Sequence, residues 1–307
     1  MAEVFRIEDP RDRDVFAGSS CAFGVFDGVH SGHRFLLGEA CKTAAQCGGR
    51  SIALTFDIDP DERFHAQRLK KLLSNEDRIA MLAESGVDAV VILPFTPEFS
   101  SRSPEEFLSN TFGEFAPAYL HVGSDFRFGK KAAGTVAELR AWAQRSGTHI
   151  CAHDLVSADG APITATRIRL LLADGKVREA AELLTYPYTL HDRVVAGRGE
   201  GRDMGFRTAN LVIDPMRRVL GEGVYGGYAI VDGVRYRAAV SVGVSPTFAG
   251  ETDSYSEVHI LDFEGDIYDQ DIYVEFVEWL RPMMEFPTVE ELIATVMSNI
   301  QWVRDNL

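Results

Sequence analysis

The feature of this sequence that most constrains its fold is a change of pattern near residue 185. Between residues 20 and 184, short runs of β-branched and aromatic residues alternate with longer helix-like segments, which is typical of a parallel sheet with helical connections. From about residue 186 onward, strand-like segments follow one another without helices between them. Because 307 residues exceed what one hydrophobic core usually fills, we predict two domains, residues 1–185 and residues 186–307.

The first domain is expected to be an α/β domain, a twisted parallel sheet with helices on both faces. Ligands of such a sheet bind beyond the carboxyl ends of its strands. We expect strands at 22–26, 51–56, 89–93, 119–123 and 149–152. Helices are expected at 34–46, 75–85, 104–111, 135–146 and 166–174, several of them beginning near a Ser, Thr or Asn that can cap the helix.

The second domain is expected to be a small antiparallel β-barrel with a C-terminal helix. Strands are expected at 224–231 and 234–242, and Asp232 and Gly233 between them form a hairpin signal, because both residue types tolerate positive φ. Further strands are expected at 256–263 and 272–280, before a terminal helix at 289–305.

The charge and the cysteines limit the partners and the location. With 46 acidic against 31 basic residues the net charge is −15, which argues against binding to nucleic acid or to an anionic membrane. An anionic substrate therefore needs a local cationic pocket. The apolar runs are too short to cross a bilayer, the first 16 residues lack a signal-peptide pattern, and the four cysteines lack disulfide-motif and metal spacing. We expect reduced thiols and a cytoplasmic location.

The first candidate site is the run from Gly24 to His33, Gly-Val-Phe-Asp-Gly-Val-His-Ser-Gly-His. A tight turn after a strand places two imidazoles at the start of a helix, beside free backbone N–H groups that suit an anion. Imidazole N–H groups can stabilise charge that builds on an α-phosphate, and Gly32 lets a nucleotide approach the backbone closely. We therefore predict nucleotidyl transfer. The alternatives are a chance pair or a zinc-binding pair, but no third ligand stands at an obvious spacing.

This run is similar to the G-x-F-D-G-x-H-x-G-H signature of the prokaryotic bifunctional riboflavin kinase/FAD synthetase family, and every fixed position of the signature is present. Residues 54–56 with Pro60, and residues 122–129, resemble two further motifs of the same module, in the same order. The resemblance implies a Rossmann-like nucleotidyltransferase domain that transfers an adenylyl group from ATP to FMN. By this resemblance His30 and His33 are catalytic, the nucleotide-binding residues of the signature are Gly24, Phe26, Asp27, Gly28 and Gly32, and the flavin-binding residues are Phe56, Pro60, Asp125 and Phe126. From the residues alone, a turn position for Asp125 and a core position for Phe126 fit the sequence as well as flavin binding does.

A second phosphate motif is suggested by residues 164–169, Thr-Ala-Thr-Arg-Ile-Arg, which resemble the family's Ser-Ser-Thr-x-Ile-Arg. Thr164 and Ala165 replace the two serines. The resemblance implies that Thr166, Arg167 and Arg169 bind the nucleotide, and a hydroxyl at a helix start and an arginine suit a departing pyrophosphate. The alternative is an N-cap followed by solvated arginines.

The second candidate site begins with a glycine-rich run, residues 197–205, whose backbone amides could cradle phosphates. It is not a P-loop, because no Lys-Ser or Lys-Thr follows, and by itself it is compatible with a plain hairpin loop. Residues 206–210, Phe-Arg-Thr-Ala-Asn, resemble the riboflavin kinase signature Gly-Phe-Pro-Thr-Ala-Asn, and residues 223–225, 246–248 and 257–263 resemble further motifs in order. By this resemblance Gly201, Gly205, Thr208 and Asn210 bind ATP, Thr208 and Asn210 also bind Mg²⁺, and Glu257 is the base.

The two departures from the kinase pattern are Arg207, where the family has proline, and Asp269, where a glycine is usual. Arg207 could add a phosphate contact or misplace Thr208. The predicted function is that of a bifunctional enzyme with ATP as co-substrate and Mg²⁺ as cofactor: the barrel converts riboflavin to FMN, and the first domain converts FMN to FAD and pyrophosphate. The alternatives are a single-activity FAD synthetase whose barrel only binds flavin, and a flavin-binding regulator without turnover. No nucleic-acid or membrane partner is expected.

Overall fold

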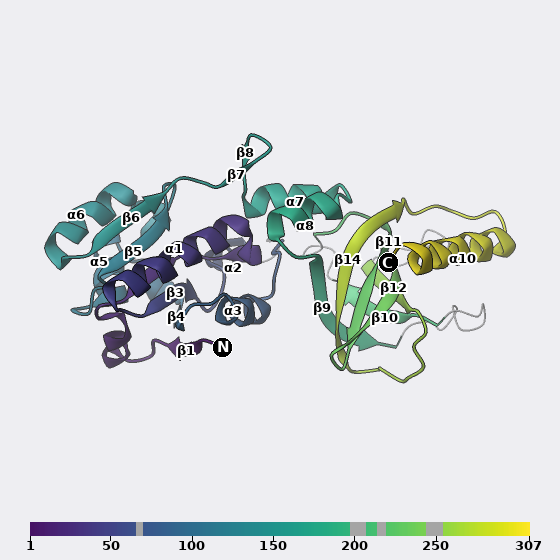
Figure 1. Cartoon of the computed structure of the whole chain (residues 1–307), viewed down its shortest axis with the longest axis horizontal. Coiled ribbons are helices and arrows are strands. Elements are labelled where there is room, and N and C mark those ends of the chain that lie inside the picture. The colour runs from purple at the N-terminus through teal and green to yellow at the C-terminus, as the bar shows by residue number, and fades with distance from the viewer. Residues whose placement is uncertain (66–69, 197–206, 214–218, 244–253) are drawn as a thin grey trace. The chain divides into compact units, whose positions relative to one another are not determined.

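The computed structural model describes residues 1–65, 70–196, 207–213, 219–243 and 254–307. The chain divides into two compact units (Figure 1). The first unit comprises Met1–Leu69 and Leu73–Ala165, and the second comprises Lys70–Leu72 and Thr166–Leu307. Each unit has one of the two architectures expected from the sequence.

The first unit contains a six-stranded sheet in the order β1-β4-β3-β2-β5-β6, and every neighbouring pair is parallel. Its strands are β1 (Glu3–Arg6), β2 (Ser20–Phe23), β3 (Ser51–Phe56), β4 (Ala89–Leu93), β5 (Tyr119–Gly123) and β6 (His149–His153). The predicted parallel sheet is confirmed, and the edge strand β1 was not expected. The prediction that the second of these strands extends to residue 26 was wrong, because Phe26 has a left-handed backbone conformation that no strand adopts.

Helices connect the strands and begin where the sequence provides caps. The longer ones are α1 (Ser31–Cys47), α3 (Asn75–Ala83), α5 (Pro104–Phe112) and α6 (Val136–Ser146), and the shorter ones are η1 (Pro10–Phe16), η2 (Asp27–Val29), α2 (Pro60–His65), α4 (Pro97–Ser100) and η3 (Lys130–Ala132). Ser103 and Thr135 form capping boxes with Glu106 and Glu138 at α5 and α6, which satisfies N–H groups that have no partner inside the helix. A two-stranded hairpin, β7 (Ser157–Ala158) and β8 (Ala161–Pro162), precedes the end of the unit.

Alternate residues of the central strands enter two separate hydrophobic cores. On β3, Ile52 and Leu54 belong to one core, and Ala53 between them belongs to the other. Because successive side chains of a strand point to opposite faces, the two cores lie on the two faces of the sheet. The sheet is therefore covered on both faces, as parallel sheets usually are.

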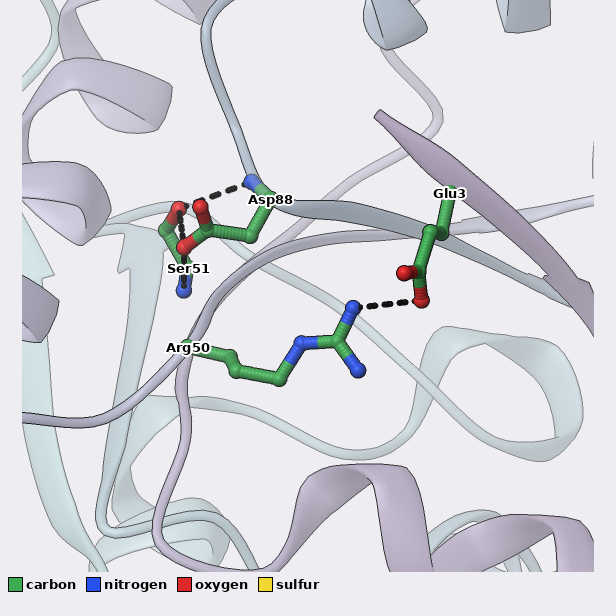
Figure 2. A network of polar contacts seen from close by, with 4 residues as sticks. All are labelled: Glu3, Arg50, Ser51 and Asp88. Carbon is green, nitrogen blue, oxygen red and sulfur yellow. Dashed lines mark hydrogen bonds and ion pairs between the residues drawn. The ribbon is translucent and has the colours of Figure 1, made fainter. Parts of the chain in front are cut away.

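The amino ends of three strands are joined by polar contacts (Figure 2). Asp88, one residue before β4, accepts hydrogen bonds from the backbone N–H of Ser51 at 2.8 Å and from its hydroxyl at 2.7 Å. These bonds lower the pKa of the Asp88 carboxyl. Arg50 also forms an exposed ion pair with Glu3 at 2.8 Å. These contacts lie at the edge of the sheet opposite to the carboxyl ends of the strands.

The second unit contains a closed barrel in the order β10-β13-β12-β11-β14-β9, in which every neighbouring pair is antiparallel. Its strands are β9 (Tyr188–Val195), β10 (Ala209–Ile213), β11 (Gly223–Val231), β12 (Val234–Gly243), β13 (Ser254–Ile260) and β14 (Asp271–Arg281). The predicted barrel is confirmed, although β9 and β10 were not expected as strands. Asp232 and Gly233 have φ of 50° and 78°, as the predicted two-residue hairpin turn requires. The prediction that a strand continues to residue 263 was wrong, because Asp262 has φ of 57°.

In its described residues the second unit has the helices α7 (Ala165–Ala173, all but its first residue), α8 (Val177–Leu184) and α10 (Val289–Asn306). The terminal helix was predicted, and it packs on the barrel through a core of Leu261, Ile300 and Val303. The Tyr228 hydroxyl donates a hydrogen bond to the carbonyl oxygen of Leu307 at 2.9 Å. This bond fixes the end of α10 against β11.

Two adjacent glycines of β11 allow a prediction about the barrel. A Cβ added at Gly227 would collide with the backbone carbonyl of Glu275 on β14, whereas one added at Gly226 would meet the ring of Trp302 on α10, 3.0 Å away. A backbone cannot move aside as a side chain can. We expect Gly227→Ala to lower the free energy of unfolding of the second unit by about 2 to 4 kcal/mol, and Gly226→Ala by about 1 kcal/mol.

Urea denaturation followed by tryptophan fluorescence would measure both losses, because Trp279 and Trp302 lie in the second unit. Equal losses for the two variants would show that the β14 backbone does not limit the packing at Gly227.

Candidate functional site

The chain leaves the sheet after β2 through a turn of left-handed residues. Phe26, Gly28 and Val29 have φ of 61°, 75° and 35°, and positive φ is costly for residues other than glycine. Such strain persists only where the surrounding structure enforces it, and it is common at functional sites. After the turn His30 is extended and forms the N-cap of α1. The predicted helix start at residue 34 was three residues too late because a histidine is not a usual cap.

His30 and His33 lie against each other at this helix N-terminus. Their rings stack with centroids 3.6 Å apart, and the edge of Phe26 meets His33 at 5.3 Å. Nδ1 of His30 accepts a hydrogen bond from the backbone N–H of His33, so in the neutral ring the proton is on Nε2. Burial, and then the neighbouring His30, hold the pKa of His33 well below its usual range. The structure therefore brings the two predicted catalytic histidines together, and burial favours the neutral form of His33.

The predicted glycines of this motif are packed closely. A Cβ at Gly32 would stand 3.2 Å from the His30 ring, and one at Gly24 would stand 3.3 Å from the Phe26 ring. A side chain at Gly32 would therefore displace the His30 imidazole. Asp27 is buried, and its carboxylate accepts a hydrogen bond from the backbone N–H of Leu73 at 3.3 Å.

This turn follows β2, the strand at which the chain changes from adding strands on one side to adding them on the other. The chain proceeds from β2 to β3 and β4 on one side, and then crosses to β5 on the other side of β2. In sheets of this kind the carboxyl ends of the two strands at the reversal border a ligand-binding crevice. The loop after β5 contains the predicted residues Asp125, which is exposed, and Phe126, which is half-buried.

The predicted flavin-binding residues lie at the carboxyl edge of the same sheet. The ring of Phe23, the last residue of β2, is 5.2 Å from Phe126 and 5.6 Å from Phe56. Phe56 is 6 % exposed and is mainly a core residue, while Pro60 begins α2 and is half-buried. The sheet thus brings these aromatic residues together around Phe23.

The second phosphate motif lies at the start of α7. Thr166 is exposed, and Arg167 and Arg169 are half-buried. All three belong to the second unit.

Sequence reasoning missed a pair of histidines on β5 and β6. His121 Nδ1 and His153 Nε2 are 3.0 Å apart, and the rings are nearly parallel, with centroids at 5.2 Å. Burial, and then the charge of His153, lower the pKa of His121 from 6.5 to about 4. A histidine among the apolar residues of a predicted buried strand is the one signal that could have indicated this pair.

Arg78 on α3 was also missed. It is 2 % exposed, and it lies four residues before the buried Leu82 on the inward face of the helix. An arginine at a core position of a helical pattern was the available signal, since arginines are seldom buried without partners.

The second candidate site lies on the β10–β13 ladder of the barrel. Asn210 pairs directly with Glu257, and directly opposed residues of antiparallel strands share one face of the sheet. Asn210 is 8 % exposed, whereas Glu257 is exposed. The ladder thus brings two of the predicted kinase-site residues next to each other.

Thr208 and Asn210 line a cavity of about 300 Å³. The other lining residues are Val194, Arg207, Ala209, Val258, Ile260, Phe263, Gly265, Asp266, Ile267 and Tyr268. Glu257 is not among the described residues that line this cavity. Gly201, Gly205 and the motif at residues 246–248 lie outside the described residues.

Arg207 and Asp269, the two departures from the kinase pattern, each have a defined backbone environment. The carbonyl oxygen of Arg207 lies 2.8 Å from Nδ1 of His259, which anchors the residue before Thr208 while the Arg207 side chain is exposed. Asp269 has φ of 60°, a conformation that glycine adopts freely and that aspartate tolerates better than most residues.

The alternative for His30 and His33 was a zinc-binding pair, which needs further ligands. In the part of the chain that the structure describes, no group of three or more His, Cys, Asp or Glu side chains could hold a metal ion. The cysteines at 21, 41, 47 and 151 are free thiols.

Comparisons with known proteins agree for both units. The family model described as FAD synthetase matches residues 13–167, and the one described as riboflavin kinase matches residues 184–307. Two relatives, from Listeria monocytogenes and Pseudomonas fluorescens, are both called bifunctional riboflavin kinase/FMN adenylyltransferase. The first is 33% identical over 92% of this chain and 90% of its own length, and the second is 32% identical over 95% and 94%.

A solved structure is also similar over the full length. Its title names a macrolide-efflux protein from Streptococcus pneumoniae, and it superposes with a TM-score of 0.86 and 29% identity over 99% of both chains. In the described part of the present chain, no helix has both the length and the apolar character needed to cross a membrane.

The buried His121 predicts a pH dependence of stability. Its pKa is about 4 in the folded protein and near 6.5 when exposed, so between these values the unfolded state binds a proton that the folded state does not. The contribution of His121 to stability is therefore full above pH 6.5 and is lost as the pH falls toward 4, with a slope of up to ~1.4 kcal/mol per pH unit. The groups that shift this pKa besides burial are His153 and Glu39.

We expect His121→Gln to reduce the loss of unfolding free energy between pH 6.5 and 4.5, measured by urea denaturation. His149→Gln, which changes an exposed histidine on β6, is the matched control. An unchanged pH slope in His121→Gln would contradict the assignment.

Proposed function

The chain belongs to the family of bifunctional riboflavin kinase/FMN adenylyltransferases, and we propose that residues 1–185 carry one of the two reactions and residues 186–307 the other. The enzyme phosphorylates riboflavin with ATP to FMN, and adenylylates FMN with ATP to FAD and pyrophosphate. The observation that supports one reaction per domain is that the FAD synthetase model matches residues 13–167 and the riboflavin kinase model matches residues 184–307. The proposed domains are residues 1–185 and 186–307.

In the adenylyltransferase reaction, a phosphate oxygen of FMN attacks the α-phosphorus of ATP, and pyrophosphate leaves. His30 and His33 are proposed to donate hydrogen bonds to the α-phosphate oxygens, where negative charge builds in the transition state. The contact at His30 fits this role, because Nε2 of His30 is left to donate when Nδ1 accepts the His33 amide. The N-terminus of α1 adds partial positive charge at the same place.

The remaining residues of this reaction are proposed to bind its two substrates. Gly24, Phe26, Asp27, Gly28 and Gly32 shape the turn that receives the nucleotide, and Thr166, Arg167 and Arg169 neutralise the departing pyrophosphate. Phe56, Pro60, Asp125 and Phe126 are proposed to contact the flavin. Phe56 and Phe126 support this assignment by lying against Phe23 at the carboxyl end of β2.

In the kinase reaction, Glu257 is proposed to accept the proton of the riboflavin 5′-hydroxyl as that oxygen attacks the γ-phosphate of ATP. Thr208 and Asn210 line one cavity, and a hydroxyl and an amide oxygen fit Mg²⁺, which also binds substrate phosphates and water. When bound, Mg²⁺ would neutralise the phosphate charge. Gly201 and Gly205 are proposed to contribute backbone amides to the nucleotide.

Arg207 is proposed to be compatible with kinase activity. Its carbonyl oxygen has His259 as a partner at 2.8 Å, and a proline carbonyl could accept the same bond. The position of Thr208 therefore depends on an interaction that the exchange from proline to arginine retains.

We also propose a cytoplasmic location, small-molecule substrates, and no nucleic-acid or membrane partner. The net charge of −15 opposes binding to polyanions, and the four free cysteines suit a reducing compartment.

A product time course by chromatography tests both assignments on the full-length protein. Purified protein receives Mg²⁺-ATP with riboflavin in one reaction and with FMN in another. The expected result is FMN followed by FAD in the first reaction, and FAD in the second. Formation of FAD from FMN with riboflavin left unchanged would refute the kinase assignment.

The double substitution His30→Ala/His33→Ala is expected to lower FAD formation from FMN at least about a hundredfold, because two transition-state donors are lost. Riboflavin phosphorylation in the same preparation should stay within about twofold, since both histidines lie outside residues 184–307, which match the riboflavin kinase model. A loss of both activities to the same extent would contradict separate sites.

The converse variant is Glu257→Gln, which keeps the size of the side chain but removes the base. Riboflavin phosphorylation should fall by about a hundredfold or more, while FAD formation from FMN stays unchanged. Removal of Mg²⁺ with a chelator should abolish phosphorylation, and added Mg²⁺ should restore it. Full phosphorylation by Glu257→Gln would show that another group accepts the proton.

A further inference from the structure

A buried guanidinium joins the ends of two strands beneath the adenylyltransferase turn. Arg78 on α3 is 2 % exposed. It donates hydrogen bonds to the carbonyl oxygens of Val25 at 2.9 Å and Phe56 at 2.8 Å, and to the hydroxyl of Thr55 at 2.6 Å. A fourth bond, to the side-chain oxygen of Asn75, measures 3.3 Å. None of the reactions described above uses this side chain.

The acceptors lie where the sheet stops holding β2 and β3 together. The parallel ladder between these strands ends at the pair Phe23 and Leu54, and the last backbone bond runs from Gly24 N–H to the Leu54 carbonyl at 3.2 Å. Beyond this bond, Arg78 contacts the carbonyl of Val25 on one side and Thr55 and Phe56 on the other. The guanidinium thus connects the two chain segments beyond the point where the β2–β3 ladder ends.

The bridged segment leads directly into the strained turn. Val25 immediately precedes Phe26, the first of the residues with positive φ, and the turn ends at His30, the N-cap of α1. Strained conformations persist only where neighbouring contacts hold them. A fixed Val25 carbonyl therefore fixes the point from which the turn begins.

The charge of Arg78 also matters for an anionic substrate. Asp59, Asp27, Glu62 and Asp57 all interact electrostatically with the guanidinium. Their carboxylates lie near the end of β3 and the turn, where they would repel a triphosphate. One buried positive charge offsets part of that repulsion.

We propose that Arg78 is a positioning residue for adenylyl transfer, which holds the turn from Phe26 to His30 in place by bridging the ends of β2 and β3. The inference rests on the proposed function of the first unit. Arginine suits the task better than lysine, because its planar guanidinium carries five N–H donors in a fixed arrangement and can bond several acceptors at once.

The test uses the full-length protein with Arg78→Met and Arg78→Lys. We expect Arg78→Met to lower kcat for FAD formation from FMN at least tenfold, with KM for FMN changed less than threefold, because the flavin contacts are not removed. Arg78→Lys should recover part of kcat, since it keeps the charge but not the bridge. Riboflavin phosphorylation should remain within twofold in both variants.

Arg50→Met is the matched control, because Arg50 pairs with Glu3 at the opposite edge of the same sheet (Figure 2) and should leave both activities within twofold. Thr55→Val removes one acceptor and keeps Arg78, so it covers the case in which Arg78→Met does not fold. It should lower kcat for FAD formation in the same direction by about threefold.

Hydrogen exchange separates this inference from the proposed function, because it needs no turnover. Amides of residues 26–33 should exchange at least tenfold faster in Arg78→Met, or in Thr55→Val to a smaller extent, while those of β5 keep their rates. Unchanged exchange in this turn, or FAD formation within twofold of wild type in Arg78→Met, overturns the inference. If the wild-type protein forms no FAD, the proposed function fails, and the exchange rates still decide whether Arg78 holds the turn.

Discussion

The first unit depends on how its chain leaves the sheet after β2. The positive φ of Phe26, Gly28 and Val29 turns the chain so that His30 caps α1 and its ring stacks on His33. A helix N-terminus, two stacked imidazoles and the reversal of strand order therefore coincide at one place. Each of these alone attracts an anion only weakly, and their coincidence supports the proposed site of nucleotidyl transfer.

The second unit carries its proposed site on a closed barrel instead of a parallel sheet. Thr208 and Asn210, the proposed Mg²⁺ ligands, lie at the start of β10 and line one cavity, and the ladder register places Glu257 opposite Asn210. A shift of one residue in that register would move the glutamate to the other face of the sheet. The closed barrel fixes the register, since every strand has two neighbours.

Patterns of local origin were predictable. The buried strands β3 and β4 were predicted at their observed bounds, because both faces of a parallel strand are apolar and the run is continuous. The hairpin at Asp232 and Gly233 was likewise predictable from turn chemistry. The edge strand β1 and the barrel strands β9 and β10 were missed, because short or partly polar strands acquire their structure from the neighbours with which they pair.

The sequence by itself determined the two-domain order, the parallel sheet followed by a barrel, and the family, because motifs such as Gly24 to His33 are contiguous in the chain. Only the tertiary structure decided the proton position on His30, the low pKa of His121 and the four hydrogen bonds of Arg78. These properties depend on burial and on partners as far as 53 residues away in the chain. Distances of that kind are set by packing, and no local sequence pattern records them.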